Sequence, residues 1–143
     1  QNPGLISEII TILIGINDIG MMMNTCRTEE QQHTMQYSFQ THYEELLTIL
    51  TKSTSRIILM EPFLFPCPAF YQAWLPLRHS MAENIQKLAR QFQLPYLTLH
   101  QELNEEVRKY GYSSITTDGI HLTSQGQKFL ADRLYPLLLS FDI

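Results

Sequence analysis

The sequence predicts a three-layer α/β domain built around a parallel sheet, and two observations predict that class. Three short apolar runs rich in branched residues lack polar alternation, which is typical of parallel strands covered on both faces; they span residues 9–14, 57–60 and 96–99. Stretches with the 3.6-residue period of amphipathic helices lie between and after these runs. Alternation of this kind favours right-handed crossovers with helices on both faces of the sheet.

The helices are assigned from their apolar stripes. The first predicted helix carries Phe39, Tyr43, Leu46, Leu47 and Leu50, and the second carries Leu77, Met81, Ile85, Leu88 and Phe92. A final helix follows Leu122 and turns Phe129, Leu130, Leu134, Leu137 and Leu138 inward. Ser124 and Gln127 have the spacing of a capping box at its start, although Thr123 could be the cap instead.

Two stretches are predicted to be loops that follow the carboxyl ends of strands. Residues 21–33 are polar after three methionines, and residues 61–68 contain three prolines. In open parallel sheets this edge is where ligands bind. The methionines, together with Phe63 and Phe65, could either cover the core or form an apolar wall for an acyl group.

Composition bounds the function classes. A chain of 143 residues with 44% hydrophobic content has the size and core of a single domain, taken as residues 1–143. Its net charge of −4 comes without a basic stripe, which argues against a nucleic-acid partner. The apolar runs are far shorter than the roughly 20 residues of a membrane span. The two cysteines, Cys26 and Cys67, predict neither a disulfide framework nor a zinc site, and their low number favours a cytoplasmic location.

The first motif that could carry chemistry is Gly15-Ile16-Asn17-Asp18, at the end of the first predicted strand. The glycine permits a tight turn, and the Asn17 amide is a neutral donor able to stabilise a tetrahedral oxyanion. The same residues are also ordinary turn formers. Alone, the motif leaves both interpretations open.

The second motif is Asp118-Gly119-Ile120-His121, just before the final helix. An acid three residues before a histidine can accept a hydrogen bond from one ring nitrogen, which leaves the other nitrogen as a general base. The alternative is an Asp-Gly turn beside a surface histidine. The remaining histidines, His33, His42, His79 and His100, receive no role, and Glu61 is expected to brace the turn at Pro62.

Taken together, the order and spacing of the two motifs resemble those of the SGNH (GDSL-type) serine hydrolases, over residues 5–139. The resemblance implies a flavodoxin-like fold, Asn17 as oxyanion-hole donor, Asp118 as orienting acid and His121 as general base. It also implies no metal and no organic cofactor. Asp18 is interpreted as a residue that braces the loop.

The chain departs from the family pattern in one respect, because it contains no Gly-Asp-Ser block for the nucleophilic serine. Ser7 is too close to the first strand to replace it, and Ser38, Ser80 and Ser124 lie in or beside predicted helices. The resemblance then assigns this chain the third, fourth and fifth strands of the family sheet. We expect an N-terminally incomplete domain, lacking roughly 50 to 80 residues, whose open strand edge could pair with a second copy of the chain.

The function expected from the resemblance is hydrolysis of a carboxylic ester, a small molecule of short-acyl or acetylated-sugar type, by a Ser-His-Asp site. Because the serine lies outside this chain, the chain alone is expected to be inactive. Two alternatives stay open: a non-catalytic binding module of the same fold, and a metal-dependent phosphoesterase using Asp18, Asp118, His121 and His100.

Overall fold

The computed structural model describes residues 9–141 and centres on a parallel sheet. Its strands, in spatial order, are β1 (Ile10–Ile12), β2 (Ile57–Met60) and β3 (Tyr96–Leu97). Ile10 lies opposite Ile57, and Leu59 lies opposite Tyr96. The three parallel strands predicted from the sequence are confirmed, although β1 and β3 are shorter than the apolar runs that predicted them.

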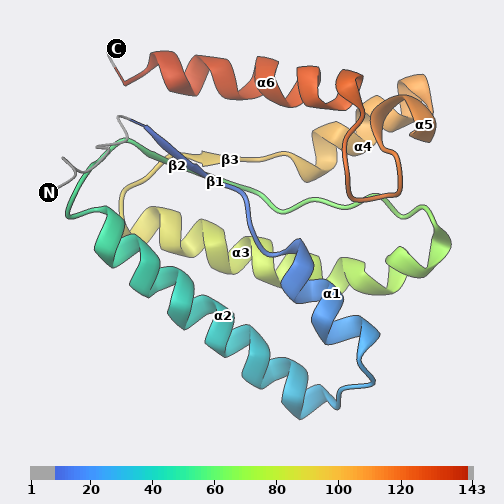
Figure 1. The fold of residues 1–143 in the computed structure, drawn as a ribbon, viewed down its shortest axis with the longest axis horizontal. Coiled ribbons are helices and arrows are strands. Elements are labelled where there is room, and N and C mark those ends of the chain that lie inside the picture. Colours follow the sequence, from blue (N-terminus) through green and yellow to red (C-terminus); the bar gives the residue numbers. More distant parts are fainter. Residues whose placement is uncertain (1–8, 142–143) are drawn as a thin grey trace, which may run out of the picture.

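Helices form a layer on each face of this sheet (Figure 1). On one face lie α1 (Ile16–Asn24), α2 (Glu29–Leu50) and α3 (Leu75–Gln91), which is preceded by the 3-10 helix η1 (Ala69–Trp74). On the other lie α4 (His100–Tyr110), α5 (Tyr112–Ile115) and α6 (Ser124–Leu139). The predicted three-layer α/β class is therefore confirmed.

The central strand β2 explains why its sequence lacks polar alternation. Successive side chains of a strand point to opposite faces, and all four residues of β2 are buried. Ile57 and Leu59 pack into the hydrophobic cluster formed with α1, α2 and α3. Ile58 and Met60 pack into a second cluster with α4, α5 and α6. The continuous apolar run is thus a strand with a core on each side.

Strand β1 is different, because it lies at the edge of the sheet. Ile12 is buried, but Thr11 is exposed, and so are Leu13 and Ile14 just beyond the strand. Within residues 9–141 β1 pairs only with β2. The open edge expected from the sequence is therefore present in the described part of the chain.

The prediction of a loop over residues 21–33 is wrong. Helix α1 continues to Asn24 and α2 begins at Glu29, so that only residues 25–28 connect them. Thr28 caps α2 with a reciprocal capping box. Its hydroxyl accepts from the backbone N–H of Gln31, and the side-chain oxygen of Gln31 accepts from the backbone N–H of Thr28. The Thr-x-x-Gln spacing is a sequence signal for a helix start, and it outweighs the polar composition.

The second predicted loop, the Glu61–Pro68 segment, is confirmed as irregular chain at the carboxyl end of β2. Its prolines cannot donate to a sheet or a helix ladder. Four helices of the described residues were not predicted, namely α1, η1, α4 and α5. As for membrane association, none of the helices within residues 9–141 has the length and apolar character of a membrane span.

Candidate functional site

The Asp118–His121 motif lies on a loop closed by its own backbone. Thr116 and Leu122 form an antiparallel bridge at the base of the loop. The buried Thr116 hydroxyl donates to the His121 carbonyl oxygen at 2.7 Å and accepts from the Gly119 N–H at 2.9 Å. The Thr117 N–H donates to the same carbonyl at 3.0 Å. These bonds hold the loop in its conformation without any contribution from the Asp118 or His121 side chains.

Gly119 allows this loop to dock on the Glu61–Pro68 segment. Its φ of +94° lies in the left-handed region, and a Cβ at this position would meet the Cys67 carbonyl oxygen and the Tyr71 ring, the latter at 2.7 Å. The Phe65 N–H donates to the Gly119 carbonyl oxygen at 2.8 Å. Only glycine combines this backbone conformation with so close an approach.

Asp118 and His121 form the hydrogen-bonded pair that the sequence predicted. One carboxylate oxygen, Oδ2, lies 2.6 Å from His121 Nδ1. The other, Oδ1, accepts from the backbone N–H groups of His121 at 2.8 Å and Ile120 at 2.9 Å. The backbone N–H of His121, followed by its side chain, lowers the pKa of Asp118 to about 2. An ionised Asp118 can only accept, so it holds a proton on Nδ1 and leaves Nε2 available as a base.

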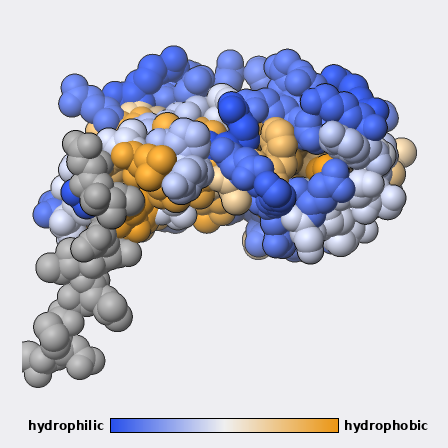
Figure 2. All heavy atoms as spheres, turned by 90° about the horizontal axis from the view of Figure 1, so that it is seen from above, coloured by the Kyte–Doolittle hydropathy of each residue, from blue (hydrophilic) through white to orange (hydrophobic). Residues whose placement is uncertain are grey.

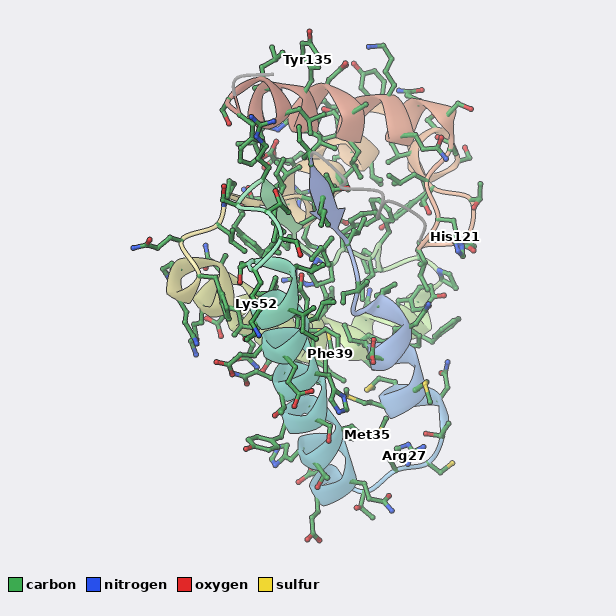
Figure 3. The ribbon with its side chains drawn as sticks, turned by 60° about the vertical axis from the view of Figure 1, so that its left-hand side comes forward. Arg27, Met35, Phe39, Lys52, His121 and Tyr135 are labelled. Atoms are coloured by element: carbon green, nitrogen blue, oxygen red, sulfur yellow. The ribbon has the colours of Figure 1, made fainter. Side chains whose placement is uncertain are left out.

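The His121 side chain is 77% exposed, so that its outer nitrogen is open to an incoming group. Figure 3 places it on the loop that descends from α6 toward α1. Because burial contributes little to its orientation, the bond to Asp118 and the backbone of the loop must supply it.

Asn17 lies near the start of α1, directly after the sheet. Gly15 separates β1 from α1 with a φ of +124°, and a Cβ there would lie 2.5 Å from Met81 Sδ. The helix begins at Ile16. Asn17 is therefore an exposed residue of the first helical turn, where the sequence had suggested a turn. Its amide lies at the positive end of the helix dipole, which suits a donor to an anion.

A small apolar cavity lies between the two motifs. It has a volume of about 150 Å³, and its walls are Leu13, Ile14, Ile16, Pro62, Phe63 and Ile120. Ile16 immediately precedes Asn17, and Ile120 immediately precedes His121. The fold thus brings the chain neighbours of Asn17 and His121 to one cavity at the carboxyl edge of the sheet.

A larger cavity of about 470 Å³ opens between α1 and α2. Ile14 lines both cavities, and Asp18 lines this one together with Met21 and Met22. Met35 and Phe39 project into the same space from α2 (Figure 3). Asp18, which the sequence suggested as a loop brace, stands in the first turn of α1, and burial raises its pKa.

The Glu61–Pro68 segment is held by a polar network that the sequence revealed only in part. Glu61 was expected to brace the turn, and it does so by pairing with Arg78 at 2.8 Å. Burial alone would raise the pKa of Glu61, but the N–H groups of His100 and Leu99, together with Arg78, outweigh it and lower that pKa. Arg78 itself was missed. Its signal is a charged residue adjacent to Leu77 on the apolar stripe of α3.

No serine hydroxyl within residues 9–141 is hydrogen-bonded to the His121 ring, whose bond goes to Asp118. Ser38, Ser80 and Ser124 lie in α2, α3 and α6, as expected, and Ser7 is outside the described residues. The described part of the chain also contains no group of three His, Cys, Asp or Glu side chains that could hold a metal ion. The metal set considered from the sequence is therefore not assembled there.

Solved structures with a similar fold include several hydrolases. A Parabacteroides merdae protein described as a GDSL-like lipase is 19% identical, with a TM-score of 0.77 over 93% of this chain and 61% of that one. LAE5, an alpha/beta hydrolase enzyme from the metagenome of Lake Arreo, is 16% identical, with a TM-score of 0.79 over 98% and 63%. The acetylxylan esterase Axe2 from Geobacillus stearothermophilus is 16% identical, with a TM-score of 0.75 over 95% and 63%.

At these identities the likeness shows the fold, and this chain spans less than two thirds of the length of each of these proteins. No curated protein matches the chain closely enough to serve as a relative. Residues 1–129, a range that includes Asn17, Asp118 and His121, match a family of GDSL-like lipases and acylhydrolases. The resemblance suggested by the sequence motifs is confirmed: the chain belongs to the GDSL-like lipase/acylhydrolase family.

Proposed function

We propose that this chain contributes three residues to a serine-type acyl hydrolase that cleaves carboxylic esters. His121 is the general base, Asp118 orients it, and Asn17 is a donor to the oxyanion. The nucleophilic serine comes from outside residues 1–143. The observation that carries the proposal is the 2.6 Å Asp118–His121 bond, because it orients a histidine whose neighbour in the chain, Ile120, lines an apolar cavity.

The chemistry assigned to each residue follows from its protonation state. Nε2 of His121 takes the proton from the serine hydroxyl as the serine oxygen bonds to the ester carbonyl carbon. His121 then returns that proton to the departing alcohol, and the same cycle with water releases the acid. Asp118 stays ionised throughout, since its pKa is about 2, and it stabilises the imidazolium that forms. The Asn17 amide donates to the developing oxyanion.

The apolar cavity beside the Asp118–His121 loop indicates the substrate class. A volume of about 150 Å³ with apolar walls suits a short acyl group and offers no charged partner for a phosphate. An acetyl ester fits this description. One structure of similar fold is an acetylxylan esterase, which makes acetylated sugars a reasonable class to test first.

The proposal is tested with 4-nitrophenyl acetate. The 143-residue chain should be inactive, and the same chain carrying its native upstream sequence should hydrolyse the ester without loss in a chelator. His121→Ala should lower that rate by about 10²–10⁴-fold because the general base is removed. His79→Ala is the matched control, since His79 is an exposed histidine on α3.

Chelator-sensitive phosphatase activity, or ester cleavage that survives His121→Ala, would refute this function. Binding of acetyl esters without turnover by the extended protein would instead favour the non-catalytic module. That alternative has a specific basis, because no serine of the described residues is bonded to His121.

A further inference from the structure

Four polar side chains from two helices and a strand end hold the Glu61–Pro68 segment in place. They are Glu61 at the end of β2, Arg78 on α3, and His100 and Asn104 on α4. We propose that they are positioning residues, which orient the Asp118–His121 pair through the backbone of this segment. The catalytic value of this positioning rests on the proposed function. Its effect on the orientation of His121 can be measured without any assay of activity.

The first step is the anchoring of Glu61. One carboxylate oxygen, Oε2, accepts from the backbone N–H groups of Leu99 at 2.7 Å and His100 at 2.9 Å, where β3 leads into α4. The other, Oε1, accepts from Arg78 Nη1 at 2.8 Å. Glu61 therefore ties the end of β2 to both helical layers at once.

Further hydrogen bonds fix the backbone of the segment beyond Glu61. Arg78 Nη1 also donates to the Pro62 carbonyl oxygen at 3.3 Å. The Asn104 amide donates to the Leu64 carbonyl oxygen at 3.2 Å, and the Leu64 N–H donates to His100 Nδ1 at 3.5 Å. Burial lowers the pKa of His100 to about 4, so this ring is neutral near pH 7 and can accept. The backbone of Pro62 and Leu64 is thus held by side chains of α3 and α4.

A backbone hydrogen bond connects the segment to the Asp118–His121 loop. The Phe65 N–H, next in the chain after Leu64, donates to the Gly119 carbonyl oxygen at 2.8 Å. Gly119 follows Asp118 directly, and its backbone is pressed against Cys67 and Tyr71. A displacement of the segment must therefore move the Gly119–Ile120 peptide, whose N–H donates to the orienting carboxylate of Asp118.

The energetic cost of the ion pair supports a role beyond stability. The Arg78 and Glu61 side chains are only 6% and 15% exposed. Removing a charged pair from water costs about as much as the attraction returns, so that such pairs are poor stabilisers. Such pairs can specify geometry through directional hydrogen bonds, and the Glu61 carboxylate accepts three of them. An exposed histidine on a short loop depends on such rigid support for its orientation.

The experiment measures the tautomer of His121 in the 143-residue chain by long-range ¹H–¹⁵N NMR. In the unaltered chain the neutral ring should carry its proton on Nδ1, facing Asp118. Asn104→Ala, which removes the bond to Leu64, should raise the ratio of the Nε2–H form to the Nδ1–H form about twofold or more. Glu61→Gln should raise this tautomer ratio further. If Glu61→Gln does not fold, the result for Asn104→Ala is sufficient to test the proposal.

Tyr96→Phe is the matched control, because it deletes a side-chain bond of the same 3.2 Å length to the carbonyl oxygen of Ala82, outside the segment. It should leave the ratio unchanged. A wild-type ratio in Asn104→Ala overturns the proposal, as does an equal change in both variants, which would indicate general loosening. If the unaltered extended protein does not hydrolyse the ester in the assay above, while Asn104→Ala still shifts the tautomer ratio, the proposed function alone is refuted.

Discussion

Burial contributes little to the orientation of the exposed His121 side chain. Its partner Asp118 is half exposed, yet three hydrogen bonds converge on that carboxylate. Two of them come from backbone N–H groups of the same turn. Local chain geometry therefore contributes directly to the pair, although the Asp118–His121 motif alone left a turn with a surface histidine open, and the pair was predicted from both motifs together.

Asp118 should make stability depend on pH in the acid range. Its pKa of about 2 in the folded chain lies below the ordinary 3.8, so its contribution is complete above about pH 4 and is lost as the pH falls toward 2. Removing the His121 side chain should raise this pKa only part of the way to 3.8, because the backbone N–H of residue 121 remains. A ¹³C carboxyl titration of His121→Ala measures this, and a value at or above 3.8 would contradict it.

The site residues were predictable from the sequence to different degrees. Asp118 and His121 are close in the chain, and their bond follows from local spacing. That Ile16 and Ile120 line one cavity could not be predicted from either motif alone, because the cavity depends on how the Glu61–Pro68 segment is folded between them. Arg78 was missed because an isolated arginine beside an apolar stripe gives no indication of its partner.

At the scale of elements, the start of α6 resolves a choice that the sequence left open. Thr123 is the N-cap, and its hydroxyl accepts from the Gly126 N–H at 3.2 Å. The same hydroxyl also donates to the Ser114 carbonyl oxygen, which joins α6 to α5. Ser124 is the first residue inside the helix and is exposed.

Thr123→Ala should therefore destabilise the fold, whereas Ser124→Ala should not. Loss of a capping hydroxyl costs about 0.5–2 kcal/mol, and the lost bond to Ser114 places Thr123→Ala toward the upper end. Ser124→Ala should stay within about 0.5 kcal/mol of the parent, as exposed substitutions do. Urea denaturation followed by circular dichroism measures both. Equal losses would indicate that the cap is shared.

The elements that the sequence did not predict share a physical reason. Helix α4 buries only Leu103 and Val107, so its apolar stripe is too sparse to stand out among charged neighbours. The η1 helix lies among aromatic residues next to prolines, where composition suggests a loop. In contrast, α3 buries seven residues at helical spacing and was predicted.

At the scale of the whole molecule, the edge of the sheet at β1 leaves apolar side chains exposed. Figure 2 looks onto the side that carries α6 and shows hydrophobic atoms open to solvent beside a largely hydrophilic surface. Leu13 and Ile14, just beyond the edge strand β1, are 40% and 41% exposed. An edge strand with apolar neighbours invites pairing with another strand.

The 143-residue chain should accordingly self-associate as its concentration rises, and Thr11→Pro should weaken that association. The Ile10 N–H bonds to Arg56 in the run leading to β2, so the Thr11 N–H, one residue later, faces the open edge. Proline is tolerated where the lost N–H faces outward. Sedimentation velocity of both proteins tests this. A monomeric parent at all concentrations would show that the edge is harmless.

The packing of Ile120 also bears on when the site forms. Ile120 belongs to the loop before α6, yet it packs against the hydrophobic cluster on the opposite side of the sheet, which includes Ile16 at its border. More than a hundred positions separate these two residues. Contacts of such separation form late, because the intervening chain must first lose its freedom. The packing of Ile120 near Ile16 is thus a property of the finished fold, and the NMR signals of Ile120 would report the last events of folding.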